Sequence, residues 1–306
     1  MSFRLAKEFL RTAENEGIGS AITSGANFVI RRGRLFSLRI RAGGWRTVRE
    51  INGSEMELHF HPNGADKIDR QLALNGIREA ETTLTIQRVL ERFNEETTPV
   101  HVFDVGANVG YYTLLEANVL GESGRIYAIE AEPRNAERLE KNIQLNGYSN
   151  IEVIQAAAGA ERTKQELSVR SGANVHRMST IIEDKKPIKQ VEVDVYSVDY
   201  LIREREIPDD EQIVVRIDVE GYEPFVFDGM SELFESDRPV YIMVEIHPNR
   251  EHFEVEDIVR PLVEHGFTPE YVSLDGGDTV RESDTFEDIL GIGRTSILMA
   301  SRVETD

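Results

Sequence analysis

The sequence predicts an α/β fold in which a doubly wound, mostly parallel sheet follows an N-terminal extension of β-hairpins and helices. From about residue 99 onward, short apolar runs alternate with amphipathic segments of helix length, which is the pattern of parallel strands covered on both faces. The chain has 306 residues, enough to bury a large core, and it contains no cysteine. Disulfide bonds, cysteine nucleophiles and thiolate metal sites are therefore excluded.

Residues 1–98 form the predicted extension. Its first twelve residues have the spacing of an amphipathic helix, which we expect to pack on its own domain. Residues 27–61 alternate apolar and polar side chains around glycine-containing turns, as antiparallel hairpins do. Residues 66–93 have helical spacing and lead into the polar run 94–99, so a domain boundary is predicted near residue 98.

Residues 99–306 form the predicted main domain. Its expected strands are the short apolar runs 100–105, 125–130, 151–156, 213–219, 239–246, 269–274 and 295–301. The expected helices between them are the amphipathic segments 110–120, 133–146, 223–235 and 254–265. The segment 161–196 interrupts this rhythm with two alternating stretches around a polar loop, and it is predicted to be a hairpin insertion.

The charge of the chain narrows the classes of partner. Lysine and arginine together number 35 against 55 aspartates and glutamates, so the net charge is -20 and binding to nucleic acid or to an anionic membrane surface is disfavoured. The acidic excess, with few lysines, is typical of proteins adapted to a salty cytosol. No apolar run is long enough for a transmembrane segment and the N-terminus lacks a signal peptide, so we expect a cytoplasmic protein.

The most informative segment is a strand followed by a glycine turn and a helix. Its candidate ligand-binding residues are Asp104, Gly106, Ala107, Asn108, Gly110 and Tyr112. Doubly wound sheets bind nucleotides at such a turn, because the strand order reverses there and the helix N-terminus presents N–H groups. Glu130 ends the next strand, where a carboxylate can accept both hydroxyl protons of a ribose.

The residues of the turn favour a cationic nucleoside. Asn108 stands where a dinucleotide fold has its middle glycine, and Asp104 would repel a pyrophosphate. S-adenosyl-L-methionine has a sulfonium, an ammonium and a ribose but no phosphate, so Asp104 suits its methionyl amine and Glu130 its ribose. The alternatives are an NAD-dependent dehydrogenase, which shares the turn and the acid, and a turn that binds no ligand.

Other segments extend this pattern along the chain. They are Ile129-Glu130 with Pro133 and Asn135, the run 155–159, Val198-Asp199-Tyr200-Leu201, the run from Arg216 to Glu223, and Val244-Glu245-Ile246-His247. Together with the turn, they resemble the FkbM family of S-adenosylmethionine-dependent methyltransferases over most of residues 66–247. This resemblance implies a class I methyltransferase fold, with a seven-stranded sheet whose last strand is antiparallel, and transfer of a methyl group, usually to oxygen.

The resemblance also bears on two further contacts. Many adenosyl sites have an Asp or Asn after the third strand, where this chain has Gln155 followed by three alanines. The adenine is therefore expected to meet apolar atoms and backbone amides, with Ala157 or Ala158 nearest. Glu79 lies where the family often has an acid, and it is expected near the methionine end of the cofactor.

Four ionisable residues follow two neighbouring predicted strands: Asp218, Glu220, Glu245 and His247. Residues two apart on a strand point to the same side, so we expect these four to converge on one rim. Asp218 and His247 are the best candidates to orient and deprotonate an acceptor hydroxyl, with His247 favoured because its ordinary pKa lies near neutrality.

Other readings of the rim stay open. A divalent cation such as Mg²⁺, bound by Asp218, Glu220 and Glu245, would also lower the pKa of a hydroxyl. Alternatively, these acids only solubilise the rim or cap helices. His59 and His61 are better explained as an exposed hairpin face than as a metal site, and Trp45, Tyr111, Tyr112 and Tyr222 fit a core or an acceptor pocket equally well.

The sequence thus predicts an O-methyltransferase that uses S-adenosyl-L-methionine. The acceptor is expected to be a hydroxyl of a sugar, a glycan intermediate or a small metabolite, bound partly by the N-terminal extension, and this expectation rests on the resemblance. The non-catalytic alternative is a methyltransferase fold that serves as a binding scaffold. The identity of the acceptor and the formation of homo-oligomers are left open by the sequence.

Overall fold

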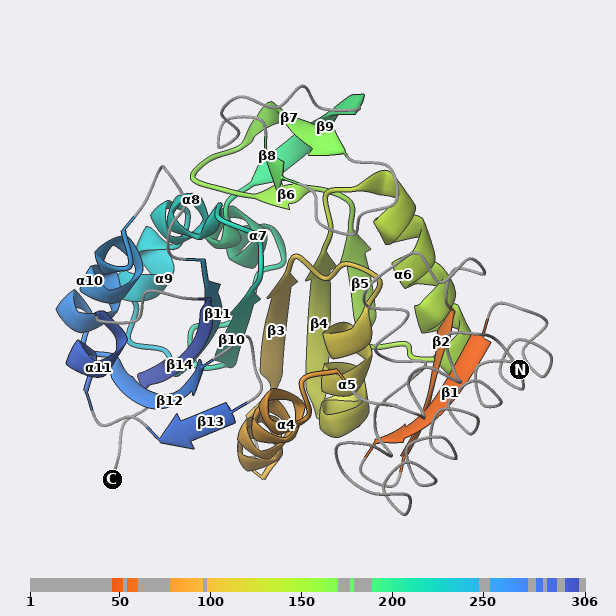
Figure 1. The fold of residues 1–306 in the computed structure, drawn as a ribbon, viewed down its shortest axis with the longest axis horizontal. Coiled ribbons are helices and arrows are strands. Elements are labelled where there is room, and N and C mark those ends of the chain that lie inside the picture. The colour runs from red at the N-terminus through yellow and green to blue at the C-terminus, as the bar shows by residue number, and fades with distance from the viewer. Residues whose placement is uncertain are drawn as a thin grey trace, which may run out of the picture.

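The computed structural model describes residues 46–51, 54–59, 78–95, 98–169, 177–178, 189–247, 254–274, 279–282, 285–290 and 295–302. The predicted N-terminal helix, the first part of the predicted hairpins, Trp45 and His61 lie outside these residues. The described part is organised around one large sheet with helices on both faces and a smaller sheet above it (Figure 1).

The central sheet contains all seven predicted strands. They are β3 (Val100–Val105), β4 (Gly124–Ile129), β5 (Ile151–Ile154), β10 (Gln212–Ile217), β11 (Val240–Ile246), β12 (Thr268–Leu274) and β14 (Ser296–Arg302). β3 pairs in parallel with β4 and β10, whereas β14 runs antiparallel between β11 and β12. One short strand that was not predicted, β13 (Thr279–Glu282), extends the edge beyond β12. The predicted doubly wound, mostly parallel sheet is therefore confirmed.

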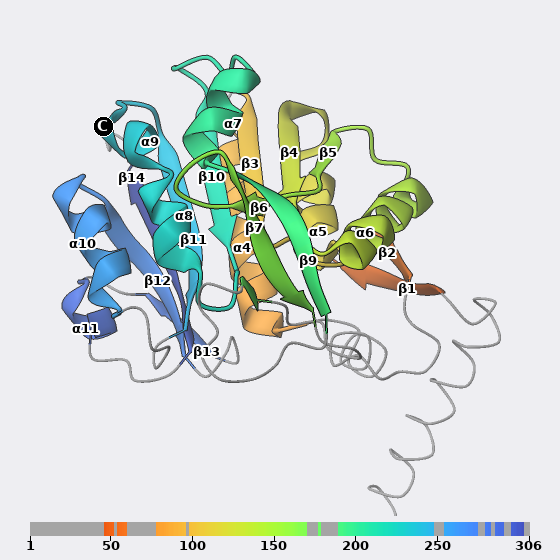
Figure 2. The ribbon, with the colours of Figure 1, turned by 90° about the horizontal axis from the view of Figure 1, so that it is seen from above.

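Helices cover both faces of this sheet (Figures 1 and 2). They are α4 (Ala80–Asn94), α5 (Tyr111–Leu120), α6 (Pro133–Asn146), α7 (Val198–Glu204), α8 (Glu223–Asp228), α9 (Ser231–Glu235), α10 (Glu256–Glu264) and α11 (Glu287–Leu290), with a 3-10 turn at Gly121–Ser123. Val102 of β3 packs with α4 and α5, while the next residue, Phe103, packs on the opposite face with α7 to α10. α4 belongs to the predicted extension, yet one face of it, with Ile86, Leu90 and Phe93, packs into the core of the main domain.

The local sequence explains where α6 begins and ends. The Glu132 side chain accepts a hydrogen bond from the Asn135 N–H, and Pro133 occupies the first turn. Gly147 closes the helix with a left-handed backbone, φ 71°. The predicted helix 223–235 instead divides into α8 and α9 at Gly229, where a Cβ atom would come within 2.2 Å of the Gly159 carbonyl oxygen. Asp199 accepts hydrogen bonds from the first N–H groups of α9, Glu232 and Leu233.

The predicted insertion, 161–196, forms most of a second sheet, to which residues 157–158 add one strand. It consists of β6 (Ala157–Ala158), β7 (Thr163–Val169), β8 (Arg177–Met178) and β9 (Lys189–Tyr196), in the order β6-β9-β7-β8. β7 and β9 are the two predicted alternating stretches and pair antiparallel. In Figure 1 this sheet lies above the upper ends of β3, β4 and β5, to which the strand arrows point. It therefore stands beyond the carboxyl ends of the strands.

The predicted hairpins are represented by β1 (Arg46–Ile51) and β2 (Ser54–His59), which pair antiparallel. The backbone of β2 lies beside α6 and α5, at the lower right of Figure 1. None of the helices in the described part of the chain combines the length and the apolar character that crossing a bilayer requires.

Candidate active site

The glycine turn joins the carboxyl end of β3 to α5. Gly106 has φ 84°, and a Cβ atom there would come within 2.0 Å of the Asp218 carbonyl oxygen. Gly110 has φ 91°, and its Cβ atom would come within 2.5 Å of the Leu139 side chain on α6. The two glycines thus allow the turn to lie directly against the end of β10 on one side and against α6 on the other.

The turn is connected to the predicted ribose acid. The Asn108 N–H donates to Glu130 Oε2 at 2.8 Å, and the Glu132 N–H donates to Glu130 Oε1 at 2.8 Å. Glu130 is only 8% exposed, and burial raises its pKa to about 7. The Asn135 side chain is a third donor to this carboxylate. The lone-pair capacity that remains on its two oxygens is available to a ligand. The structure therefore brings the turn and Glu130 together, as the sequence predicted.

Asp104 is placed differently from the prediction. Its side chain has no exposed surface. Oδ1 accepts a hydrogen bond from Arg216 at 2.8 Å, and Oδ2 accepts one from the Thr113 hydroxyl. Both oxygens are therefore enclosed by protein groups, which argues against the expected direct contact between Asp104 and a methionyl amine.

Arg216 is a site residue that sequence reasoning missed. Arg216 is the second-last residue of β10, and its guanidinium donates to Asp104 Oδ1 and also to Asp218 Oδ2 at 3.2 Å. The guanidinium carbon lies 4.1 Å from the centre of the Tyr112 ring, a cation–π contact. The available signal was one charged residue within an otherwise apolar buried strand, because such a residue needs a buried partner.

The predicted rim residues converge at the ends of β10 and β11. Asp218, Glu220 and His247 each offer one ligand atom, and these three atoms lie within 4.8 Å of one another. His247 Nε2 is 3.7 Å from Glu220 Oε2 and 3.6 Å from Glu245 Oε1. On the other side of the ring, His247 Nδ1 is 2.9 Å from Glu223 Oε1. Glu223 was not predicted as a site residue, although it lies in the quoted run from Arg216.

The rim groups differ in basicity. Burial alone would lower the pKa of His247, but Glu223, Glu245 and Glu220 outweigh it and raise this pKa to about 9. Burial and the negative charge of Asp218 raise the pKa of Glu245 to about 8. For Asp218, burial is outweighed by Arg216 and Arg78, which lower its pKa. The expectation of a near-neutral pKa for His247 is therefore wrong in these surroundings, because carboxylates surround the imidazole.

The residues just before α4 also reach the rim. Arg78 Nε donates to Glu79 Oε1 at 2.8 Å, and the Tyr112 hydroxyl donates to Glu79 Oε2 at 2.8 Å. Arg78 Nη2 lies 3.9 Å from Asp218 Oδ2. Of the four non-glycine residues with positive φ in the described chain, three lie here: Glu79, Asn108 and Glu220. Strained backbone of this kind is concentrated at functional sites.

The predicted adenine contacts and the tyrosines are mostly core residues. Ala157 and Ala158 are buried, and β6 pairs with the end of β9. Tyr111 and Tyr112 are buried at the start of α5, so their side chains belong to the core as well as bordering the site. The buried Tyr222 directs its hydroxyl to Gln165 of β7 at 3.0 Å, which ties the rim loop to the insertion.

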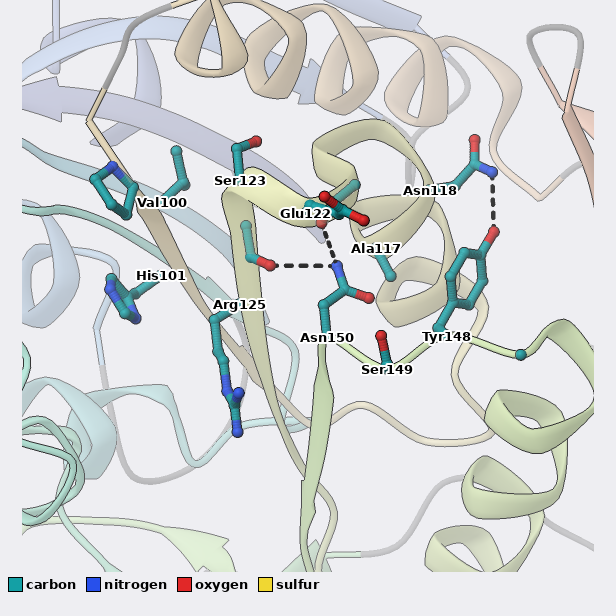
Figure 3. A pocket seen from close by; sticks show the side chains of 14 residues that line it. Val100, His101, Ala117, Asn118, Glu122, Ser123, Arg125, Tyr148, Ser149 and Asn150 are labelled. Atoms are coloured by element: carbon teal, nitrogen blue, oxygen red, sulfur yellow. Dashed lines mark hydrogen bonds between the residues drawn. The ribbon is translucent and has the colours of Figure 1, made fainter.

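A separate groove of about 540 Å³ lies at the opposite, amino-terminal ends of β3 and β4. Its lining contains none of the predicted site residues. In Figure 3 the Asn118 side chain donates to the Tyr148 hydroxyl at 2.9 Å, and the Asn150 side chain donates to the backbone carbonyl of Gly121 at 2.7 Å. We therefore assign the site to the carboxyl ends of the strands.

Comparison with known proteins shows sequence similarity to methyltransferases over different lengths of this chain. A family model described as the methyltransferase FkbM domain matches residues 104–269. The hexuronic acid methyltransferase AglP of Haloferax volcanii is 26% identical over 241 residues, which are 78% of this chain and 89% of that protein. The transmembrane O-methyltransferase of Homo sapiens is 36% identical over 87 residues, 26% of this chain, so the match spans only 30% of that relative.

Solved structures give weaker similarity. A SAM-dependent methyltransferase from Agrobacterium tumefaciens is 11% identical, with a TM-score of 0.45 over 86% of this chain and 71% of that one. The TYW2 protein of M. jannaschii, solved in complex with AdoMet, is 14% identical with a TM-score of 0.37, covering 84% of each chain.

Proposed function

The chain belongs to the FkbM methyltransferase family, and from that premise we propose that it transfers a methyl group from S-adenosyl-L-methionine to an acceptor hydroxyl. The observation that carries the proposal is the hydrogen bond between the glycine turn and the acid of the next strand, from Asn108 N–H to Glu130 Oε2 at 2.8 Å. The bond joins the glycine turn to the carboxylate that we propose binds the ribose diol, and such a pairing at strand ends is typical of nucleoside sites.

The donor set suits S-adenosyl-L-methionine. Glu130 has lone pairs for a ribose diol, and the acids around the turn suit a ligand with a sulfonium and an ammonium better than one with phosphates. The residues proposed to hold the cofactor are Gly106, Ala107, Asn108, Gly110, Tyr112, Glu130, Ala157, Ala158 and Asp218. When bound, the cofactor supplies a methyl group on a positively charged sulfur, which departs as a neutral thioether.

Asp104 takes a positioning role in this proposal. It is enclosed beneath the turn and holds Arg216 at 2.8 Å. Arg216 in turn donates to Asp218 at 3.2 Å. Asp104 therefore fixes the rim through Arg216 instead of touching the cofactor.

The rim prepares the acceptor. An alcohol becomes a strong nucleophile only as it loses its proton, and alignment with the reacting carbon contributes further to the rate. Asp218, Glu220, Glu245 and His247 converge from β10 and β11 and provide oxygen and nitrogen acceptors for that proton. The residue that takes the hydroxyl proton is set by the pKa values of these four groups, which depend on the charges around them.

The similarity to AglP, whose name describes a hexuronic acid methyltransferase, supports a proposal for the acceptor class. We propose that the acceptor of this chain is a hydroxyl on a sugar or a sugar acid, free or within a glycan. The insertion sheet and the residues before α4 border the rim, so they are the described segments best placed to select among acceptors.

Calorimetric titration of the purified protein in high salt tests the proposal, with S-adenosyl-L-methionine, S-adenosylhomocysteine and NAD titrated in parallel. Binding of both adenosyl ligands without NAD is the expected result. Methyl transfer from labelled cofactor to uronic acids, neutral sugars and their glycosides then tests the acceptor class. Binding of NAD alone would instead support a dehydrogenase, and binding of none of the three would support a scaffold.

A further inference from the structure

Carboxylates surround one imidazole at the ends of β10 and β11. Ligand atoms of Asp218, Glu220 and His247 lie within 4.8 Å of one another, and Glu245 Oε1 is 3.6 Å from His247 Nε2. Glu223 adds a fourth carboxylate, 2.9 Å from His247 Nδ1. Arg216 and Arg78 lie 3.2 Å and 3.9 Å from Asp218 Oδ2 and balance part of this negative charge. A cation bound beside His247 would balance more of it.

The orientation of His247 is set by a buried carboxylate. The Glu223 side chain has no exposed surface, and Oε1 also accepts the Gly221 N–H at 3.0 Å. A carboxylate accepts hydrogen bonds, so Nδ1 carries a hydrogen that it donates to Glu223, while Nε2 faces the rim. The His247 side chain is only 5% exposed, and its Nε2 points into the cluster. Histidines that ligate metals are commonly held by a second carboxylate in this way.

The spacing around Nε2 is wider than a hydrogen bond. The separations of 3.7 Å to Glu220 and 3.6 Å to Glu245 exceed the range of hydrogen bonds. Atoms that share one ion, each about 2.1 Å from it, lie roughly 3.0 to 3.5 Å apart. A small inward movement of the side chains would therefore give the spacing of a metal site.

We propose that Asp218, Glu220 and His247 bind a divalent cation. The ligand set is two carboxylates and one imidazole, with no thiolate, which suits Mn²⁺ and Mg²⁺, and the nitrogen ligand favours Mn²⁺. This set differs from the cation hypothesis of the sequence, in which Glu245 stood in the place of His247. Glu245 becomes a neighbouring carboxylate.

Bound there, the cation would hold an acceptor hydroxyl and lower its pKa, and the proton would pass to a nearby carboxylate. This catalytic role rests on the proposed function, whereas cation binding by itself does not. The two can therefore fail separately.

The test is binding of Mn²⁺ to the whole protein after removal of metals with EDTA and dialysis. Calorimetry and the loss of the six-line electron paramagnetic resonance signal of free Mn²⁺ should show one site per chain, from which Mg²⁺ displaces Mn²⁺. Glu220→Gln and His247→Ala should each weaken binding at least tenfold. His101→Ala is the matched control, because His101 is also paired with a glutamate, Glu211, but at the other end of the sheet.

Thermal unfolding of each variant identifies any loss of folding, and the partly exposed Glu220 gives a variant that removes a ligand without opening the core. Absence of Mn²⁺ and Mg²⁺ binding by the wild type at millimolar concentration would overturn the proposal. Binding that Glu220→Gln and His247→Ala leave unchanged would overturn it as well. S-adenosylhomocysteine titrated into the same samples reports separately on the proposed function.

Discussion

A single added carbon atom at position 106 would collide with the backbone of the neighbouring strand, since it would come within 2.0 Å of the Asp218 carbonyl oxygen. We therefore expect Gly106→Ala to lower the free energy of unfolding by roughly 2 to 5 kcal/mol, from backbone strain and overpacking together. Gly147→Ala is the control, because Gly147 has φ 71° but nothing within 4 Å of a Cβ atom. In Gly147→Ala the free energy of unfolding should fall by only about 1 to 2 kcal/mol. Urea unfolding compares the two, and equal losses would contradict the argument.

Glu130 gives a prediction for cofactor affinity. In Glu130→Gln only one oxygen acceptor remains for the two backbone N–H donors, from Asn108 and Glu132, and the contacts to the ribose are weakened. We expect the affinity for S-adenosylhomocysteine to fall about 10- to 100-fold, as for loss of a charged hydrogen bond. Glu137→Gln, on the exposed face of α6, should leave it unchanged. Calorimetry measures both, and an unchanged affinity in Glu130→Gln would remove Glu130 from the site.

The same residue predicts a dependence on pH. Burial raises the pKa of Glu130 to about 7, so the carboxyl gains a proton as the pH falls through that value. A protonated carboxyl accepts less well from a diol, and the wild-type affinity for S-adenosylhomocysteine should therefore decrease below about pH 7. In Glu130→Gln this component should disappear. Titrations from pH 5.5 to 8.5 measure the affinity of both proteins. The same pH profile in the wild type and in Glu130→Gln would show that another group causes the dependence.

At this scale, the sequence predicted the residues but not their pairings. The convergence of Asp218 and His247 followed from strand ends and alternation. The contacts of Asp104 with Arg216, 112 residues apart, and of Glu223 with His247, 24 apart, have no local pattern that could reveal them. Since those contacts set the charges, the pKa of His247 and the burial of Asp104 could not be predicted.

Among the elements, α6 supports the glycine turn from the side. Asn142 of α6 has no exposed surface and donates to the Val109 carbonyl oxygen at 2.6 Å. Asn142→Ala should therefore loosen the turn, weaken S-adenosylhomocysteine binding several-fold and lower the free energy of unfolding by about 1 to 3 kcal/mol. Glu140→Ala, exposed on the same helix, should do neither. Retained affinity with reduced stability would limit the role of Asn142 to folding.

The predictions of elements succeeded where burial leaves a clear pattern. The seven apolar runs predicted as strands are all strands in the structure, because strands covered on both faces are apolar along most of their length. β13 was missed because Thr279–Glu282 is a short edge segment with two charged residues and only one apolar residue. The helix predicted over 223–235 was interrupted by the close approach of Gly159 to Gly229, a tertiary contact that periodicity does not report.

For the whole molecule, the net charge of -20 predicts stabilisation by salt. Raising KCl from 0.1 to 2 M shortens the range of repulsion from about 10 Å to a few ångströms, so the unfolding temperature should rise. Thermal unfolding followed by circular dichroism measures this. Sucrose, which does not screen charge, is the comparison, and an equal rise in sucrose would contradict screening as the cause.

The position of β14 has a consequence for synthesis on the ribosome. β14, Ser296–Arg302, lies between β11 and β12, although it is the last of the sheet strands to be made. Until it emerges, the nascent chain exposes the edge of β11, a strand whose side chains are nearly all buried in the finished sheet. Open strand edges of this kind pair readily with other chains. A ribosome that stalls before residue 296 would therefore carry a chain prone to aggregate.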